Sequence, residues 1–201
     1  MLIRTVMGTG HRPQYLPGGW GGYVAACSEL VQKLTAHIVS MHKEYGLERV
    51  ITGMAQGWDT LLGIAAVRAR RHVPVQLVAA VPCAGQESRW PPGARELYRR
   101  LLGEADRVYY VFPGRYEQNR NCMHERDEYM VRNSDAVLAY YLNLPYGLHS
   151  AAEMRIPARD KGGTVYTLRF ARKWAIENGL YIPVFNYCRE RKVFYEPLRQ
   201  H

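Results

Sequence analysis

The chain has 201 residues, enough for one domain that buries about 70% of the surface of its unfolded form. Hydrophobic residues make up 47% and charged residues 22% of the sequence, and no uncharged apolar run approaches the roughly 20 residues of a membrane-spanning helix. The N-terminus lacks the pattern of a secretory signal, so we expect a cytoplasmic protein without a membrane partner. The formal net charge of +9 favours an anionic ligand.

The cysteines indicate neither a disulfide framework nor a metal site. They are widely spaced and include no Cys-x-x-Cys pair, which favours reduced thiols. We therefore expect no metal and no cofactor. The four cysteines are Cys27, Cys83, Cys122 and Cys188.

Strands and helices alternate along almost the whole chain, as they do in doubly wound sheets. A strand at residues 2–7 is followed by a loop to residue 22, which holds too many prolines and glycines for a helix. Apolar residues at three- and four-residue steps then predict a helix over 23–45. Further strands are predicted at 49–52, 75–81, 107–112, 136–142 and 181–185. Further helices are predicted at 59–71, 94–105, 121–133 and 164–178.

This order predicts an α/β fold: a Rossmann-like, doubly wound, mostly parallel sheet with helices on both faces. We expect a single nucleotide-binding domain over residues 1–185, with a loop insertion at 143–161 and a C-terminal tail at 186–201. The tyrosine pairs at 109–110 and 140–141 fall within strands, so we expect them to pack in the sheet and the core.

Three glycine-bearing turns are the most informative motifs. We expect all three at the carboxyl edge of the sheet, where open α/β sheets bind ligands. Glycine lets backbone N–H groups approach a phosphate, and the following helix adds its positive N-terminal end. Three such turns at one edge indicate a nucleotide-type ligand. The predicted binding residues in these turns are Gly8, Thr9, Gly10, His11 and Arg12, then Gly53, Met54, Ala55, Gln56 and Asp59, and finally Gly162, Gly163 and Thr164.

Several of these side chains allow a structural role as well as a binding role. Arg12 is either a phosphate clamp with paired donors or a surface arginine. His11 either bonds a phosphate or base or satisfies a buried carbonyl. Asp59 either bonds a ribose hydroxyl or serves the start of the following helix as a cap or favourable charge.

The loop after the strand at 75–81 reaches the same edge and adds Glu87, Arg89 and Trp90 to the candidate ligand-binding residues. Trp90 either stacks on a base or anchors the loop ahead of the two following prolines.

In this order the motifs resemble the SLOG superfamily, a Rossmann-like group of nucleotide-binding proteins. Within it they are most similar to a bacterial and phage subgroup that starts with Gly-His-Arg-Pro. The resemblance covers residues 1–176, and it implies a nucleotide or ADP-ribose-like ligand, held by a sensor or sequestering module. It also implies a homo-oligomer, a dimer or higher. The matching segments are residues 10–14, 53–59, 85–91, 126–131, 134–135 and 162–164.

Residues 123–126, Met-His-Glu-Arg, also resemble the lonely-guy phosphoribohydrolases, which cleave the N-glycosidic bond of nucleoside monophosphates. That resemblance implies a catalytic Arg126, with Glu125 and Glu128 as carboxylates beside it. The family's second catalytic residue is a glutamate, which falls at Thr167 if Gly162 to Thr164 is the phosphate loop. An alternative alignment over residues 145–153 ends in Glu153.

We favour the first alignment, because a long helix should follow a phosphate loop. Binding is therefore predicted rather than turnover, with the phosphoribohydrolase as the alternative.

Residues 8–12 and 53–59 also resemble DNA-processing protein A, which implies single-stranded DNA binding as a third possibility. Strand-binding grooves interleave basic with aromatic residues, and we find no such stretch in the sequence. We therefore expect a nucleotide-type small molecule as the partner, and not nucleic acid.

Overall fold

The computed structural model describes residues 1–144, 150–188, 190 and 193–194. Seven strands form one sheet in the order β4-β3-β2-β1-β5-β6-β7. β1 to β6 pair in parallel and the two-residue β7 is antiparallel to β6, so the predicted Rossmann-like class is confirmed. The strands are β1 Thr5–Gly10, β2 Arg49–Thr52, β3 Gln76–Val81, β4 Arg107–Tyr110, β5 Ala136–Tyr140, β6 Val184–Cys188 and β7 Val193–Phe194.

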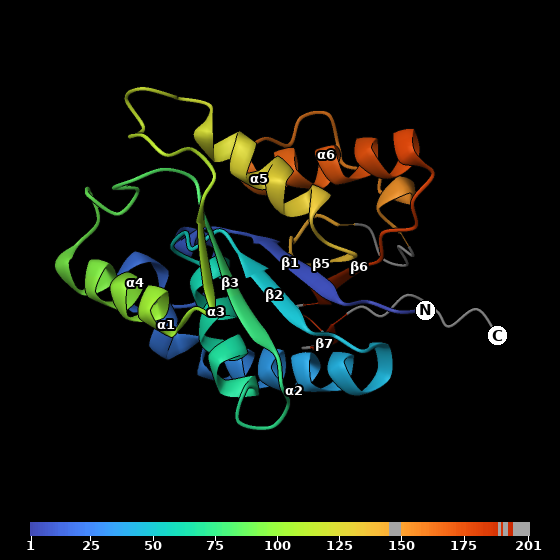
Figure 1. The fold of residues 1–201 in the computed structure, drawn as a ribbon, viewed down its shortest axis with the longest axis horizontal. Coiled ribbons are helices and arrows are strands. Elements are labelled where there is room, and N and C mark those ends of the chain that lie inside the picture. The colour runs from blue at the N-terminus through green and yellow to red at the C-terminus, as the bar shows by residue number, and fades with distance from the viewer. Residues whose placement is uncertain (145–149, 189, 191–192, 195–201) are drawn as a thin grey trace.

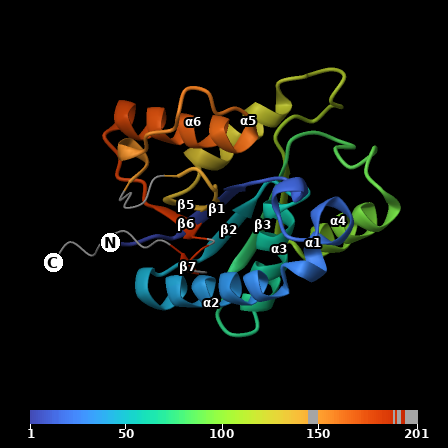
Figure 2. The ribbon, with the colours of Figure 1, turned by 180° about the vertical axis from the view of Figure 1, so that it is seen from behind.

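Helices cover both faces of this sheet (Figures 1 and 2). α5 and α6 cover one face, and α2 and α3, flanked by α1 and α4, cover the other. In addition, the 3-10 helices η1 and η2 span Pro13–Tyr15 and Ala151–Glu153. The α-helices are α1 Gly19–Ala26, α2 Ser28–Tyr45, α3 Trp58–Ala69, α4 Pro92–Glu104, α5 Cys122–Arg132 and α6 Gly163–Asn178.

The core is divided between the two faces by strand alternation. In β3, Leu77 and Ala79 pack toward α3 and α4, whereas Val78 and Ala80 pack toward α5 and α6. All four are buried, as expected for a parallel strand covered on both sides. The apolar run that predicted this strand therefore has a direct structural cause.

The segment before α2 differs from the prediction. Helix α1 begins at Gly19, inside the expected loop, and α1 and α2 meet at Cys27 where one continuous helix was expected. The glycines allow this helix start, because Gly18 and Gly19 have φ angles of 80° and 55°. Tyr23 anchors the helix in the core, which offsets the low helix propensity of its glycines.

The prediction for the tyrosine pairs is right for one pair and wrong for the other. Tyr140 and Tyr141 are buried, but Tyr109 and Tyr110 are 40% and 50% exposed. The cause is strand order, because β4 is the outermost strand of the sheet.

The expected boundary between domain and tail, after residue 185, falls inside β6. The side-chain amide of Asn186, in β6, bonds the backbone of Tyr141 next to the end of β5. Its Oδ1 accepts the Tyr141 N–H at 3.0 Å, and its Nδ2 donates to the Tyr141 carbonyl at 3.1 Å. Farther along, Phe194 in β7 stacks on His37 of α2, with ring centroids 4.4 Å apart. Residues 145–149 of the expected insertion lie outside the described residues. Within the described part of the chain, no helix combines the length and apolarity needed to cross a membrane.

Candidate functional site

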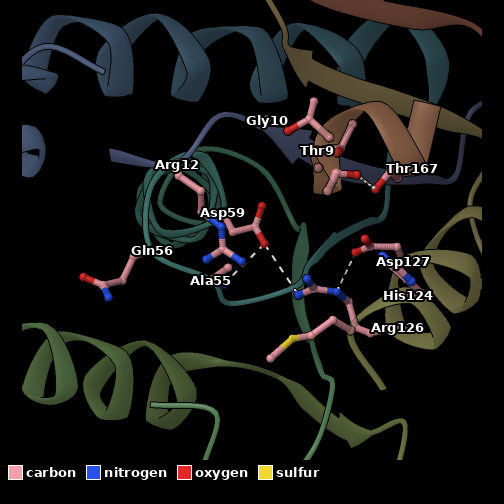
Figure 3. A pocket seen from close by; sticks show the side chains of 14 residues that line it. Thr9, Gly10, Arg12, Ala55, Gln56, Asp59, His124, Arg126, Asp127 and Thr167 are labelled. Carbon is pink, nitrogen blue, oxygen red and sulfur yellow. Dashed lines mark hydrogen bonds and ion pairs between the residues drawn. The ribbon is translucent and has the colours of Figure 1, made fainter. Parts of the chain in front are cut away.

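A polar cavity of about 140 Å³ lies at the carboxyl edge of the sheet, where the three glycine turns come together (Figure 3). The last residues of β1 with Arg12, and the turn after β2, form one side, and α5 with the start of α6 forms the other. The first glycine motif was predicted as a turn after a strand at 2–7, but Gly8, Thr9 and Gly10 belong to β1 itself, which runs from Thr5 to Gly10. Its lining residues are Gly8, Thr9, Gly10, Arg12, Ala55, Gln56, Asp59, Met123, His124, Arg126, Asp127, Gly163, Thr164 and Thr167.

The cavity includes many of the residues proposed from the sequence, but not all of them. Four of its residues were not proposed as binding residues: Met123, His124, Asp127 and Thr167. The first three belong to α5, where Arg126 and Asp127 lie three and four residues after Met123, and Asp127 lies three after His124, so helical spacing was the available signal. Proposed residues that do not line the cavity are His11, Gly53, Met54, Glu87, Arg89, Trp90, Glu125, Glu128 and Gly162.

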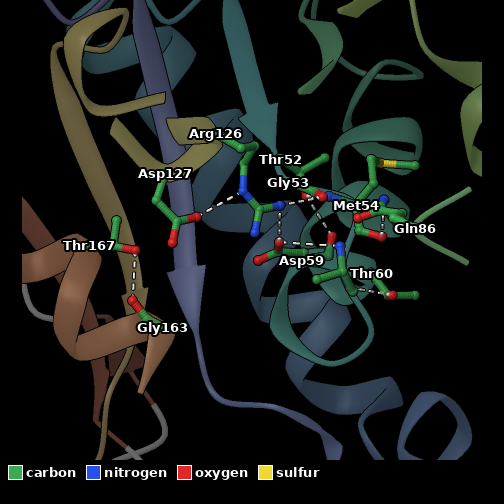
Figure 4. Close-up of polar contacts among 11 residues, drawn as sticks. Thr52, Gly53, Met54, Asp59, Thr60, Gln86, Arg126, Asp127, Gly163 and Thr167 are labelled. Atoms are coloured by element: carbon green, nitrogen blue, oxygen red, sulfur yellow. Dashed lines mark hydrogen bonds and ion pairs between the residues drawn. The ribbon is translucent and has the colours of Figure 1, made fainter. Parts of the chain in front are cut away.

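Arg126 lies at the centre of a buried ion-pair network (Figure 4). Its Nε donates to Asp127 Oδ1 at 2.8 Å, and its Nη1 donates to the carbonyl oxygen of Gly53. The same Nη1 lies 3.7 Å from Asp59 Oδ2. Burial alone would lower the pKa of Arg126, but the two adjacent carboxylates outweigh it and raise the pKa. Much of the arginine's charge is therefore compensated by protein groups rather than left for a ligand.

The turn between β2 and α3 is held by hydrogen bonds to its own neighbours. The Ala55 N–H donates to Asp59 Oδ2 at 3.3 Å, and Thr60 Oγ1 donates to the Ala55 carbonyl at 2.9 Å. Met54 has a φ of 57°, the only positive φ of a described non-glycine residue. Such strain persists only where surrounding contacts impose it. The turn is therefore a pre-formed wall of the cavity.

Asp59 is a buried carboxyl at the second position of α3. Burial raises its pKa, while Arg126 and Arg12 lower it to a smaller extent. No side-chain capping bond is made at this helix start. Asp59 instead connects the turn to Arg126, a third role beside the two proposed from the sequence.

The glycines at the end of β1 and at the start of α6 differ in what surrounds them. A Cβ at Gly8 would clash with Leu62, and one at Gly10 would lie 2.5 Å from Cγ of Trp58. Their missing side chains make room for α3, so only their backbones face the cavity. By contrast, no described atom lies within 4 Å of the Cβ position of Gly163.

The start of α6 supplies the anion-attracting part of the cavity. Gly162, with a φ of 112°, precedes the helix, and Gly163 and Thr164 occupy its first two positions. Backbone N–H groups in the first turn of a helix lack intrahelical partners and carry a partial positive charge. Thr167 does not block this end, because its hydroxyl donates to the Gly163 carbonyl at 2.9 Å. The expected phosphate loop thus opens a long helix beside the cavity.

His11 connects two strand ends next to the cavity. Its ring Nε2 accepts the backbone N–H of Leu142 at 3.2 Å, and its backbone N–H donates to the Tyr140 carbonyl at 3.2 Å. Burial lowers its pKa, which favours the neutral ring that this acceptor role requires. The side chain thus satisfies a backbone N–H group, not the carbonyl considered in the sequence analysis.

Glu125 and Glu128 make contacts outside the cavity. Glu125 is exposed and accepts a hydrogen bond from Asn119 at 2.7 Å. Glu128 accepts one from the Tyr166 hydroxyl at 2.6 Å and pairs with Arg132 at 2.8 Å. The carboxylates that line the cavity are instead those of Asp59 and Asp127.

The loop after β3 lies to the side of the cavity. Gln86 donates from Nε2 to the Met54 carbonyl at 3.4 Å, which links this loop to the second glycine turn. Trp90 packs edge-on against Tyr98 of α4, with ring centroids 5.3 Å apart, and Arg89 is exposed. These contacts match the anchoring alternative for Trp90.

An open parallel sheet with a cavity at its carboxyl edge defines this chain as a Rossmann-like α/β protein. More particularly, the model of the YspA SLOG family matches residues 6–148, and the chain belongs to that family. Membership of this family indicates a nucleotide-related function.

Curated relatives and a solved structure agree with this placement. The chain is 27% identical over 125 residues to the uncharacterized SPbeta prophage-derived protein YoqJ of Bacillus subtilis, covering 56% of this chain and 72% of that protein. It is 26% identical over 99 residues to a UPF0398 protein of Brevibacillus brevis, covering 49% and 52% of the two chains. DNA processing protein A of Streptococcus pneumoniae shares the fold at 15% identity and a TM-score of 0.52, covering 92% of this chain and 50% of that one. The chain thus spans about half the length of the last two proteins.

Proposed function

We propose that the protein binds a nucleotide or a nucleotide-derived, ADP-ribose-like ligand at the carboxyl edge of its sheet, as a sensor or sequestering module. One observation carries the proposal: the three glycine turns enclose a single cavity with a helix N-terminus at its side. The open glycine pair at 162–163 leaves room for a phosphate against the first N–H groups of α6. The exposed Arg12, which also lines the cavity, supplies a second cationic group.

The size of the cavity indicates how such a ligand would lie. At about 140 Å³ it is smaller than the roughly 300–1,000 Å³ of most ligand pockets, so it takes only part of a nucleotide. A second hollow of about 320 Å³ borders it and shares His124 and Gly163. Lys161 and Arg169 line this second hollow, which suits a further anionic group. A ligand with a phosphate at the start of α6 would extend into it.

Binding without turnover is the preferred form of the proposal. In the favoured alignment, Thr167 stands where the lonely-guy phosphoribohydrolases carry a glutamate, and its hydroxyl donates to the helix backbone. A threonine cannot act as a carboxylate base at that position.

Calorimetry with AMP, ADP and ADP-ribose tests this function. At least one of them should bind, and Arg12→Gln should weaken that binding about tenfold through loss of a charge-assisted bond. Arg172→Gln, an exposed arginine on α6 that does not line the cavity, is the matched control and should bind like the parent. If all three compounds fail to bind, and native mass spectrometry detects no co-purified nucleotide, the proposal is wrong.

A hydrolase is the second candidate, favoured by the two carboxyl groups inside the cavity. Burial raises the pKa of Asp59, whereas Asp127 is held as an ion pair with Arg126. Two carboxyl groups in unlike environments are the usual arrangement of an acid and a base. Release of free base from AMP, measured by chromatography and abolished in Asp127→Asn, would establish this candidate. The absence of base release from any nucleoside monophosphate would exclude it.

A further inference from the structure

The outer edge of the sheet presents aromatic and basic side chains together. Tyr109, Tyr110 and Tyr116 are 40%, 50% and 41% exposed. Arg107, Arg115 and Arg120 are exposed between and beside them. We call residues 107–120 the edge ribbon. Figures 1 and 2 show it running along the side of the sheet and then outward to the start of α5.

This interleaving was missed in the sequence because the two tyrosines of β4 were assigned to a packed strand. The register of β4 on β3 places Arg107 and Tyr109 on the face of α5, and Val108 and Tyr110 on the opposite face. Tyr109 approaches Tyr129 of α5 with ring centroids 6.2 Å apart. Aromatic rings therefore border the sheet edge on both sides and remain open to solvent.

The edge ribbon carries more positive than negative charge. Arg107, Arg115 and Arg120 form no ion pair with any described residue, and Glu117 is the only acidic residue in the ribbon. Arg107 makes a contact of 3.4 Å with the Tyr109 hydroxyl, which keeps its guanidinium beside an exposed ring. The chain as a whole carries a net charge of +9. The ribbon thus combines cations with flat rings, separately from the cavity.

We propose that the edge ribbon binds single-stranded nucleic acid, whose bases stack on the tyrosines and whose phosphates pair with the arginines. Stacking and phosphate contacts of this kind do not depend on base sequence. A second copy of the chain, paired along the free edge of β4, is the other occupant that a sheet edge could take. Charge argues against it, because two copies would bring their arginine-rich ribbons together.

Fluorescence anisotropy with a labelled oligothymidylate of 20 nucleotides tests the proposal. Tyr109→Ala and Tyr116→Ala should each weaken binding about fivefold or more, because each removes a stacking ring. Tyr116 lies outside the helices and strands, so the thermal unfolding of Tyr116→Ala should be nearly unchanged, whereas Tyr109→Ala also removes the contact with Tyr129. Neutralising three phosphates gives a slope of log affinity against log salt of about −2, a loss of about 20-fold between 50 and 200 mM salt.

A charge-matched pair of triple variants separates the edge ribbon from general positive charge. The variant with Arg107, Arg115 and Arg120 all changed to Gln should lose most of this salt dependence. The control changes the exposed Lys43, Arg155 and Arg172 to Gln and should retain it.

Four results would overturn the proposal. One is no binding of the oligonucleotide at 50 mM salt. Another is equal affinity for a duplex of the same length with no effect of the tyrosine variants, which would mean charge attraction alone. A third is loss of binding in Arg12→Gln but not in the ribbon variants, which would place the strand in the cavity. The fourth is a dimer in light scattering that Tyr109→Ala disrupts while the oligonucleotide stays unbound, which would make the ribbon a protein interface.

Discussion

The guanidinium of Arg126 fills the space into which a side chain at residue 53 would extend. A Cβ built on Gly53 would clash with Nη1 and Cζ of this arginine, and it would lie 2.8 Å from Oδ2 of Asp59. The two residues are 73 positions apart in the chain and are joined by a hydrogen bond from Nη1 to the Gly53 carbonyl. Gly53 is therefore needed by a buried ion-pair network, and its φ is not positive.

Gly53→Ala should lower the free energy of unfolding by about 2 kcal/mol or more, because the guanidinium would have to leave the carbonyl and carboxylate groups that hold it in a buried position. Urea denaturation followed by circular dichroism measures this change. Gly103→Ala is the control: no described atom lies within 4 Å of its Cβ position in α4. That variant should be more stable by about 0.5–1 kcal/mol, as alanine is in a helix. Equal stability of Gly53→Ala and the parent would contradict the position of Arg126.

Gly163→Val should weaken ligand binding with little effect on stability. Its side chain would extend into open space at the start of α6, so the free energy of unfolding should change by less than about 1 kcal/mol. Binding of ADP-ribose or AMP, measured by calorimetry, should fall at least about tenfold, because the methyl groups occupy the phosphate position. An affinity equal to that of the parent would place the phosphate elsewhere.

Asp59 should make the protein less stable as the pH rises. Its pKa in the folded protein is raised, chiefly by burial, so the folded state keeps the proton over a range in which the unfolded state loses it. The stabilisation is complete below the ordinary pKa of 3.8 and is lost as the pH rises through the folded pKa. Between these two pKa values, each step of one pH unit removes about 1.4 kcal/mol.

Unfolding in urea between pH 4 and 8 measures this effect. Asp59→Asn should gain stability relative to the parent as the pH rises, and the exposed Glu104→Gln should show no such trend. A constant difference between Asp59→Asn and the parent over this range would mean that the aspartate ionises normally.

His37 should make the protein sensitive to acid. The ring is buried between Phe185 and Phe194, and its Nε2 has no hydrogen-bond partner among the described residues. Burial lowers its pKa from 6.5 to about 4, partly opposed by Glu44. Over this pH range the imidazole is protonated in the unfolded chain but stays neutral in the folded protein. About 3 kcal/mol of stability is therefore lost as the pH falls from 6.5 to 4.

Thermal unfolding at pH 7 and at pH 4.5 checks the effect. His37→Gln, which is neutral at both values, should lose less stability between them than the parent does. The exposed His72→Gln should behave like the parent. If His37→Gln and the parent lose the same amount, the imidazole is not buried as a neutral group.

The sequence predicted the sheet and the meeting of the three turns, because these depend on local patterns. The strand at 49–52 was predicted without error, and the helix predicted at 164–178 begins one residue earlier. What local patterns do not contain is the identity of distant neighbours. The glycine pattern predicted ligand contact at residues 8 and 10, but not that Leu62 and Trp58 of α3 fill the space that side chains there would need.

Strand order was the other missing information. Residues 107–110 have the composition of a sheltered strand, yet β4 lies at the outer edge with all four residues exposed. Only the order of strands distinguishes an inner from an outer position, and that order is set by contacts between segments far apart in the sequence. The basic and aromatic surface of the edge ribbon therefore became visible only in the folded protein.

Trp58 holds together one side of the cavity. Its indole N–H donates to the Leu138 carbonyl at 3.1 Å, its ring stacks on Tyr140 at 5.4 Å, and its backbone N–H donates to the His11 carbonyl at 3.1 Å. The ends of β1 and β5 and the start of α3 are thus fastened to one side chain with no exposed surface. A bound molecule would therefore meet this side of the cavity already in place, with one buried residue rather than the loops themselves fixing its shape.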